Sequence, residues 1–305
     1  MRKHRKRRGL AGAATLFAVL AVLVLVLAAS ASAKLVGEFT KFQYCPYKTA
    51  GVARCINSLT TGGEIVLGKK KVTIEKSVTL QGGYTEAPEE GEPEEGVSKF
   101  FAATNGVTLS KAPQNVPGGL AGIVPEEGSP ALVKALIKFF FENSLTGVNS
   151  TLELAKAATD IRISELHLAE GLGVALEMPV KVHLENPFLG KSCFVGSSSS
   201  PIVWKLTSGQ SSPPKGTEPI SGKIGTLSFL EEGRILKIEG NELVDNAWSA
   251  PAASGCGGII SFLVNPIINT QVGLPSAAGK NSARLKNTIY EATAFAVNKN
   301  DEKNP

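Results

Sequence analysis

The sequence predicts a mainly β protein, an antiparallel sandwich or a barrel-like fold, with one principal helix. Runs in which apolar and polar residues alternate recur along the chain, and this period is typical of half-buried strands. Turn residues rich in glycine and proline separate these runs, whereas only 130–142 combines helix-start signals with a long apolar stretch. The alternatives are an α+β fold and a short β-helix-like part near the N-terminus, although no repeat of 20–30 residues recurs downstream.

The composition is that of a globular chain with enough apolar material for a substantial core. The chain has 305 residues, of which 43% are hydrophobic and 19% are charged, a balance that excludes an intrinsically disordered protein. The formal net charge is +5, but six of the 32 basic residues precede residue 9, where no acid occurs. The rest of the chain therefore carries 26 basic against 27 acidic residues, and we expect no nucleic-acid partner.

The first 33 residues have the order of a secretory signal peptide. A basic segment ends at Arg8, residues 16–29 are all apolar, and the small residues Ala31-Ser32-Ala33 form a cleavage-site pattern. The alternative is an uncleaved N-terminal membrane anchor, because residues 9–33 carry no charge and about 20 apolar residues suffice to span a bilayer.

We therefore expect a signal peptide at 1–33, followed by a single exported β-rich domain at 34–305. The domain would be secreted or otherwise extracytoplasmic, and under the alternative it would be anchored to the cytoplasmic membrane by residues 9–33. Any association with the envelope or a membrane is expected through this N-terminal segment.

The cysteines agree with an oxidising compartment. The exported part has an even number of them, Cys45, Cys55, Cys193 and Cys256, and none belongs to a C-x-x-C pair that would indicate a metal site. The short spacing of Cys45 and Cys55 can be closed by a bent loop, which leaves Cys193 and Cys256 to pair across the chain. We predict two structural disulfides.

The first half of the domain predicts strand, loop and helix in turn. Residues 34–82 are expected to be extended, with a clear alternation over 72–80. Residues 84–96 contain six glutamates, two prolines and two glycines, and this composition predicts a solvated loop. The helix over 130–142 is introduced by Ser129 as a cap and Pro130 at its first position.

The predicted helix is apolar around most of its circumference. Lys134 and Lys138 mark a narrow polar stripe, while Phe139–Phe141 widen the apolar surface. We expect this surface to be buried in the core, and a ligand-facing or membrane-facing surface is the alternative.

The second half of the domain predicts strands again. Alternating residues are found over 161–168, 173–185 and 285–297. Residues 223–243 are predicted to form two strands joined at Glu231-Glu232-Gly233, a hairpin with glycine in its loop.

The search for catalytic, cofactor or metal chemistry yields no candidate residue. His167 and His183 are the only histidines after the leader, and each is expected in a separate strand. The chain has three aspartates, Asp160, Asp245 and Asp301, and none of the common nucleophile, phosphate-binding or zinc motifs. We therefore predict no catalytic residue, no cofactor and no metal.

A set of short strings resembles a group of secreted bacterial proteins that have no characterised activity. The strings are Thr79–Gly83, Pro117–Leu120, Leu184–Gly190 with Cys193, 196–202, Leu243–Asn246, Gly255–Gly258 and Gly273–Gly279. They extend over about residues 79–279. The resemblance implies export and a shared fold, and it brings no catalytic residue and no ligand.

These observations favour a secreted or cell-envelope protein with a non-catalytic structural or interaction role. One alternative is a secreted carbohydrate-active enzyme, which would need two glutamate carboxyls about 5–9 Å apart in an open cleft. Another alternative is an apolar-ligand carrier, which would need a large internal cavity lined by the region of Phe139–Phe141. The partners and the oligomeric state stay open.

Overall fold

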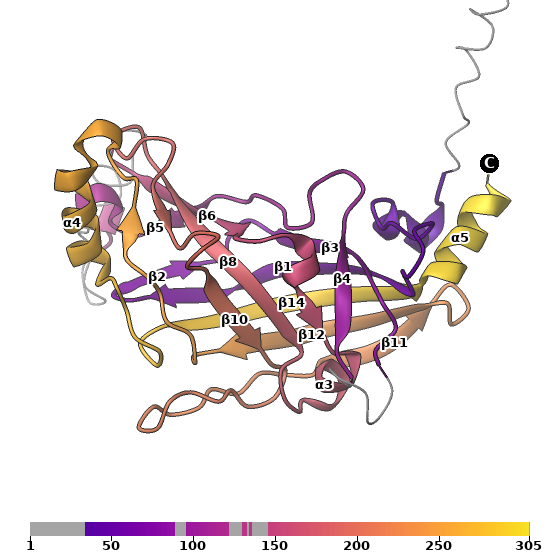
Figure 1. Ribbon diagram of the computed structural model, residues 1–305. Helices are drawn as coiled ribbons and strands as arrows, with labels where there is room; N and C mark the ends of the chain where they lie inside the picture. Colours follow the sequence, from indigo (N-terminus) through magenta and orange to yellow (C-terminus); the bar gives the residue numbers. More distant parts are fainter. Residues whose placement is uncertain (1–33, 89–95, 122–129, 133, 136–145, 305) are drawn as a thin grey trace, which may run out of the picture.

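The computed structural model describes residues 34–88, 96–121, 130–132, 134–135 and 146–304. These residues form a mainly β protein, as predicted, in which one antiparallel sheet of 14 described strands folds over into two layers without closing into a barrel (Figure 1). Every strand pair between described residues is antiparallel. The β-helix alternative is therefore wrong, because a β-helix is built from parallel strands.

The first layer has the strand order β11-β12-β14-β1-β3, with β2 paired to the end of β1. Its strands are β1 (Arg54–Leu67), β2 (Lys70–Thr73), β3 (Val78–Tyr84), β11 (Thr226–Leu230), β12 (Ile235–Asp245) and β14 (Ser282–Thr293). The predicted hairpin at 231–233 is confirmed between β11 and β12, and its three residues have positive φ angles of 51°, 59° and 88°.

The second layer crosses the first diagonally (Figure 1). Its strands are β5 (Gln114–Val116), β6 (Val148–Leu154), β7 (Arg162–Ile163), β8 (Leu176–Glu185), β9 (Phe194–Val195), β10 (Ile202–Leu206) and β13 (Ala253–Ser254). Strand β4 (Ser98–Ala102) joins the layers, because its end at Ala102 pairs with β3 and its start at Ser98 pairs with β7. The main apolar core lies between the two layers.

Helices cover the ends of this sandwich. Helix α3 (Glu165–Glu170) follows β7, α4 (Ser261–Val272) stands at one end of the molecule, and α5 (Ala294–Lys303) follows β14 at the other end (Figure 1). A second core cluster packs the 3-10 helix η1 (Gly37–Phe42) and α5 against the outer side of the first layer. None of the helices within the described residues is long and apolar enough to cross a membrane.

The prediction of a strand over 161–168 is wrong after Ile163. The Ser164 hydroxyl accepts a hydrogen bond from the backbone N–H of His167 and so caps α3, which ends at Gly171 in the left-handed region. The alternation over 285–297 likewise continues past the strand, because the Thr293 side chain accepts from Ala296 N–H and begins α5. In both places a capping side chain decides the structure.

Two other predicted segments lie partly outside the described residues. The predicted solvated loop begins with Tyr84, which is instead the buried last residue of β3, and residues 89–95 are outside the description. The described residues 131–132 and 134–135 of the predicted helix are helical and exposed, with Leu132 at 72%. Phe139–Phe141 lie outside the described residues.

Both predicted disulfides are present. Cys45 is bonded to Cys55 with a Cα–Cα distance of 5.6 Å, and Cys193 is bonded to Cys256 with a Cα–Cα distance of 4.1 Å. The two bridges fit a protein that folds outside the cytoplasm. All described elements, both core clusters and both disulfides lie between residues 34 and 304.

Candidate functional site

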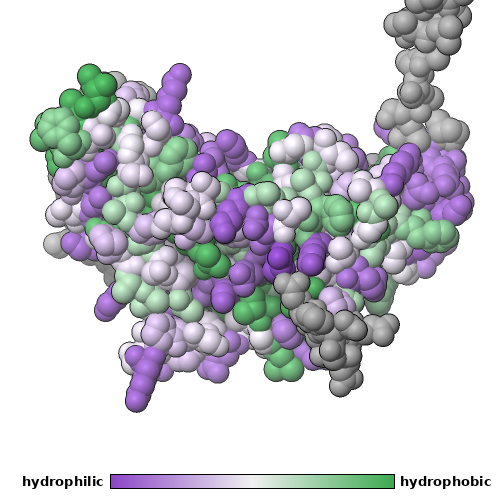
Figure 2. Space-filling model, viewed as in Figure 1, coloured by the Kyte–Doolittle hydropathy of each residue, from purple (hydrophilic) through white to green (hydrophobic). Residues whose placement is uncertain are grey.

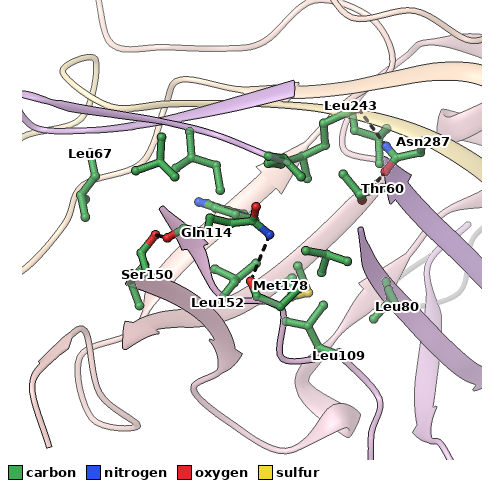
Figure 3. A pocket seen from close by; sticks show the side chains of 18 of the residues that line it. Thr60, Leu67, Leu80, Leu109, Gln114, Ser150, Leu152, Met178, Leu243 and Asn287 are labelled. Carbon is green, nitrogen blue, oxygen red and sulfur yellow. Dashed lines mark hydrogen bonds between the residues drawn. The ribbon is translucent and has the colours of Figure 1, made fainter. Parts of the chain in front are cut away.

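An apolar cavity lies between the two layers of the sandwich. Its volume is about 90 Å³. Side chains from β1, β3, β6, β8, β12 and β14 point into this common space, with Leu152 and Met178 facing Leu243 and Asn287 across it (Figure 3). The cavity thus collects residues that are more than 200 positions apart in the sequence.

Aliphatic side chains make up most of the described lining. They are Ile65, Leu67, Val72, Ile74, Val78, Leu80, Leu109, Ala112, Val116, Leu152, Leu176, Val182, Leu184, Leu243, Val272 and Leu285, joined by Met178 and Trp204. The polar members are Ser58, Thr60, Lys70, Gln114, Ser150 and Asn287. No glutamate, aspartate or histidine belongs to this described lining, so the cavity offers no acid–base pair.

Two β-bulges lie beside the polar end of the cavity. The register of β1 shifts between Thr60 and Gly62, and that of β12 shifts between Glu239 and Asn241, on either side of β14 at Asn287. Bulges bend a strand and increase its twist. Gly63 follows the first bulge with a φ of 114°, and a Cβ there would lie 1.9 Å from the backbone oxygen of Arg284. The layer therefore curves where the cavity lies.

The polar side chains of the lining bond largely to the protein itself. The Thr60 hydroxyl donates to Asn287 Oδ1 at 2.5 Å, and Asn287 Nδ2 donates to the Leu285 carbonyl. Gln114 Oε1 accepts from the backbone N–H groups of residues 75 and 76, while its Nε2 donates to the carbonyls of residues 76 and 112. Four hydrogen bonds use most of the capacity of this amide, so Gln114 holds β5 in place.

Trp204 is the exception among these polar groups. Its side chain lines the cavity, the residue is 1% exposed, and its indole Nε1 has no hydrogen-bond partner in the described structure. A buried N–H without a partner costs roughly 1–3 kcal/mol. This nitrogen is closed even to a water-sized molecule, so the indole contributes its ring to the lining and not its N–H.

A second polar group, which the sequence did not predict, lies further along the same face of the first layer. The Tyr84 hydroxyl donates to Glu165 Oε1 at 2.6 Å, and the same oxygen is 2.7 Å from Arg54 Nε. Glu291 on β14 completes this cluster, is 3% exposed, and its Oε1 has no hydrogen-bond partner in the described structure. We refer to Arg54, Tyr84, Glu165 and Glu291 as the Glu291 cluster.

The environment of Glu291 favours the neutral acid. Burial raises the pKa of its carboxyl to about 8, and the negative charge of Glu165 adds to this effect, while Arg54 opposes it. Burial, followed by the charges of Glu291 and Glu165, also raises the pKa of Tyr84 well above its usual value. Glu291 is therefore mostly protonated at neutral pH.

The Glu291 cluster is separate from the cavity. Glu291 follows Asn287 by four positions on β14, which corresponds to about 13 Å along a strand. Glu165 and Glu291 are the carboxyls that meet around Tyr84, and Glu291 is buried beneath the surface. Two glutamates thus come together, but not at an open cleft as a glycosidase needs.

The histidines and aspartates do not converge. His183 lies on β8 as predicted, stacked on Phe194 with ring centroids 4.4 Å apart, whereas His167 lies on α3 and contacts the Val174 carbonyl at 3.0 Å. Asp245 accepts two backbone N–H groups, and Asp301 pairs with Lys48 at 2.6 Å. Within the part of the chain that the structure describes, no three metal-ligating side chains cluster.

Comparison with known proteins adds no relative. No family model, no curated protein and no solved structure matches the chain.

Proposed function

We propose that this protein is an exported, non-catalytic carrier that holds a small apolar molecule or part of an acyl chain between its two sheet layers. The observation that carries this proposal is the aliphatic cavity, whose polar side chains are largely bonded to the protein. Export is supported by the signal-like leader at 1–33 and by the two disulfides.

The apolar lining supports an apolar ligand. Moving apolar surface out of water into contact with other apolar groups is favourable by about 25 cal/mol per Å² buried. A hydrocarbon ligand in this cavity of about 90 Å³ would gain that free energy against the aliphatic lining.

The chemistry of the lining limits the ligand class. A ligand rich in hydrogen-bonding groups would lose its water and find few partners, because Thr60, Asn287 and Gln114 already bond to the protein. A hydrocarbon ligand fits better, because most of the described lining is aliphatic. An aliphatic or aromatic molecule of this kind is the expected occupant.

The carbohydrate-active alternative has less support. It would use Glu165 and Glu291, but the Glu291 carboxyl is buried, and Glu165 is held by Arg54 and Tyr84. The described lining of the cavity is also apolar, whereas a sugar needs many hydrogen-bonding partners.

Binding of an uncharged apolar fluorophore tests the carrier function. We expect N-phenyl-1-naphthylamine to bind the chain produced from Lys34 onward and to accept excitation energy from Trp204, one of the two tryptophans. The substitution Ala112→Phe fills the cavity and should weaken binding at least tenfold, while the melting temperature is maintained or rises. Fluorescence titration and thermal melting measure the two effects.

The matched control is Ala169→Phe, the same change at an exposed position of α3. It should leave binding unchanged, because residue 169 does not line the cavity. The proposal is refuted if the parent does not bind the fluorophore, or if both phenylalanine variants bind it as the parent does.

A further inference from the structure

The strongest surface feature lies at the α4 end of the molecule. Five large apolar side chains of η4 (Gly258–Ile260) and α4 are exposed to solvent: Ile259 at 98%, Ile260 at 48%, Phe262 at 71%, Leu263 at 55% and Ile267 at 56%. Figure 2 shows the hydrophobic side chains gathered at this projecting corner. Phe188, 64% exposed, lies on the neighbouring loop, where the carbonyl of Leu189 accepts from Gly257 N–H. We call these six residues the α4 patch.

Helix α4 is apolar on both of its faces. Its inner face is attached to the sandwich by Ile268, which is buried, and by Asn265 and Asn269, which bond to the backbone of residues 256 and 253. The opposite face carries Phe262, Leu263 and Ile267. A helix that is hydrophobic all round normally has cover on all sides, and none of the described residues covers this exposed face.

The charges around the α4 patch favour an anionic surface. No charged residue occurs from Asn246 to Gly279, so nothing in α4 opposes burial of the patch in hydrocarbon. Lysines flank it: Lys191 is exposed on the loop whose Gly190 adjoins Gly258, and Lys69 contacts the Thr270 carbonyl at the other end of α4. The patch thus has an apolar centre and a cationic margin. This arrangement is complementary to a bilayer surface, where anionic headgroups cover the acyl chains.

The shape and composition of the patch favour a lipid over a protein partner. The most exposed residue, Ile259, lies at a projecting tip formed after Gly257 and Gly258, and a fluid acyl layer accommodates such a convex surface. The patch contains no tryptophan, tyrosine or arginine, which are the residues that carry most of the binding energy in protein interfaces. The Cys193–Cys256 bridge fixes the loops that present it.

We propose that the α4 patch docks the protein on the surface of a phospholipid bilayer that carries anionic headgroups. Docking here would place the cavity beside the bilayer, because Lys70 and Val272 line the cavity and adjoin Lys69 and the end of α4. This consequence rests on the proposed carrier function, whereas docking itself does not.

Co-sedimentation with vesicles tests the docking. We expect the chain from Lys34 onward to sediment with vesicles of phosphatidylglycerol and phosphatidylcholine in equal parts, and less with pure phosphatidylcholine or at 0.5 M salt (roughly 4 Å of screening length). Phe262→Asp should lower the partition coefficient at least tenfold. The matched control, Phe295→Asp, changes a phenylalanine that is also 71% exposed but lies on α5 at the other end, and should have no effect.

The alternatives give different results. Failure of the parent to sediment with the anionic vesicles, or equal losses in the two aspartate variants, would overturn the proposal. A parent that sediments in the ultracentrifuge as a dimer, which Phe262→Asp dissociates, would assign the patch to a second copy of the chain instead. Fluorophore binding measured without vesicles reports the carrier function separately, so either proposal can fail alone.

Discussion

Replacing Glu291 by glutamine is expected to stabilise the protein at pH 8 and to flatten the dependence of its stability on pH. The pKa of Glu291 is about 8 in the folded protein and near 4.5 when the chain is unfolded. Between these values the folded state keeps a proton that the unfolded state releases, so the free energy of unfolding falls as pH rises. At 1.36 kcal/mol for each pH unit, the loss reaches at most about 5 kcal/mol by pH 8.

The groups that face Glu291 sharpen this test. Glu165 from α3 raises its pKa, Arg54 from β1 lowers it, and Tyr84 from β3 stays neutral because its own pKa is raised. Glu165→Gln should therefore make the loss of stability smaller and end it at a lower pH, because removing this negative charge lowers the pKa of Glu291 in the folded state only. Glutamine at position 291 keeps the shape of the side chain but has no proton to lose.

Urea unfolding at pH 5, 6, 7 and 8 measures the effect. Every other titratable side chain is the same in the two proteins, so the difference between parent and variant isolates the effect of residue 291. Glu170→Gln, at an exposed position of α3, is the matched control and should follow the parent at every pH. Parallel curves for the parent and Glu291→Gln would contradict the prediction.

The sequence predicts those features that depend on a local residue pattern or on the number and spacing of the cysteines. The hairpin at Glu231-Glu232-Gly233 could be predicted because a glycine-containing turn between two alternating runs is recognisable from neighbouring residues alone. The even number of cysteines and the short 45–55 spacing give both disulfides. The strand over 173–185 is found as β8, because its apolar residues alternate over ten positions.

The helices were missed for physical reasons. In α3 the alternation of leucines imitates a strand, and the signals that decide are the Ser164 cap and Gly171 at the end. In α4 the apolar residues cover both faces, so no helical period stands out, and Pro266 lies inside the helix. In α5 the alanines continue the alternation of β14, and the Thr293 cap is the signal for the change.

The cavity and the Glu291 cluster depend on contacts between distant segments. Thr60 and Asn287 meet because β1 pairs with β14, and Met178 faces them from the other layer. Glu291 follows Tyr290 in what reads as an ordinary alternating strand, and nothing nearby marks its carboxyl as buried. An apolar cavity of about 90 Å³ is present, but Phe139–Phe141, which the sequence prediction placed in the lining of such a cavity, lie outside the described residues.

Removing the Cys193–Cys256 bridge is expected to cost more stability than removing Cys45–Cys55. The sequence separations are 63 and 10, and in the loop-entropy model these bridges contribute about 4 and about 3 kcal/mol, because the longer loop restricts the unfolded chain more. The paired variants are Cys193→Ala with Cys256→Ala, and Cys45→Ala with Cys55→Ala. All four cysteines are buried, so alanine avoids placing a new polar group in the core.

The longer bridge should also control the order of α4. The backbone N–H of Cys256 donates a hydrogen bond to Asn265 Oδ1 near the start of α4. The disulfide therefore fixes the residue to which this part of the helix is bonded. Hydrogen exchange of the amides in 258–272 should therefore accelerate in the Cys193/Cys256 variant and stay unchanged in the other, compared at equal global stability in urea. Vesicle binding should weaken in parallel, since a loose α4 patch loses entropy when it docks. If the short-bridge variant loses as much stability, or if exchange in α4 is the same in both, the bridge does not have this role.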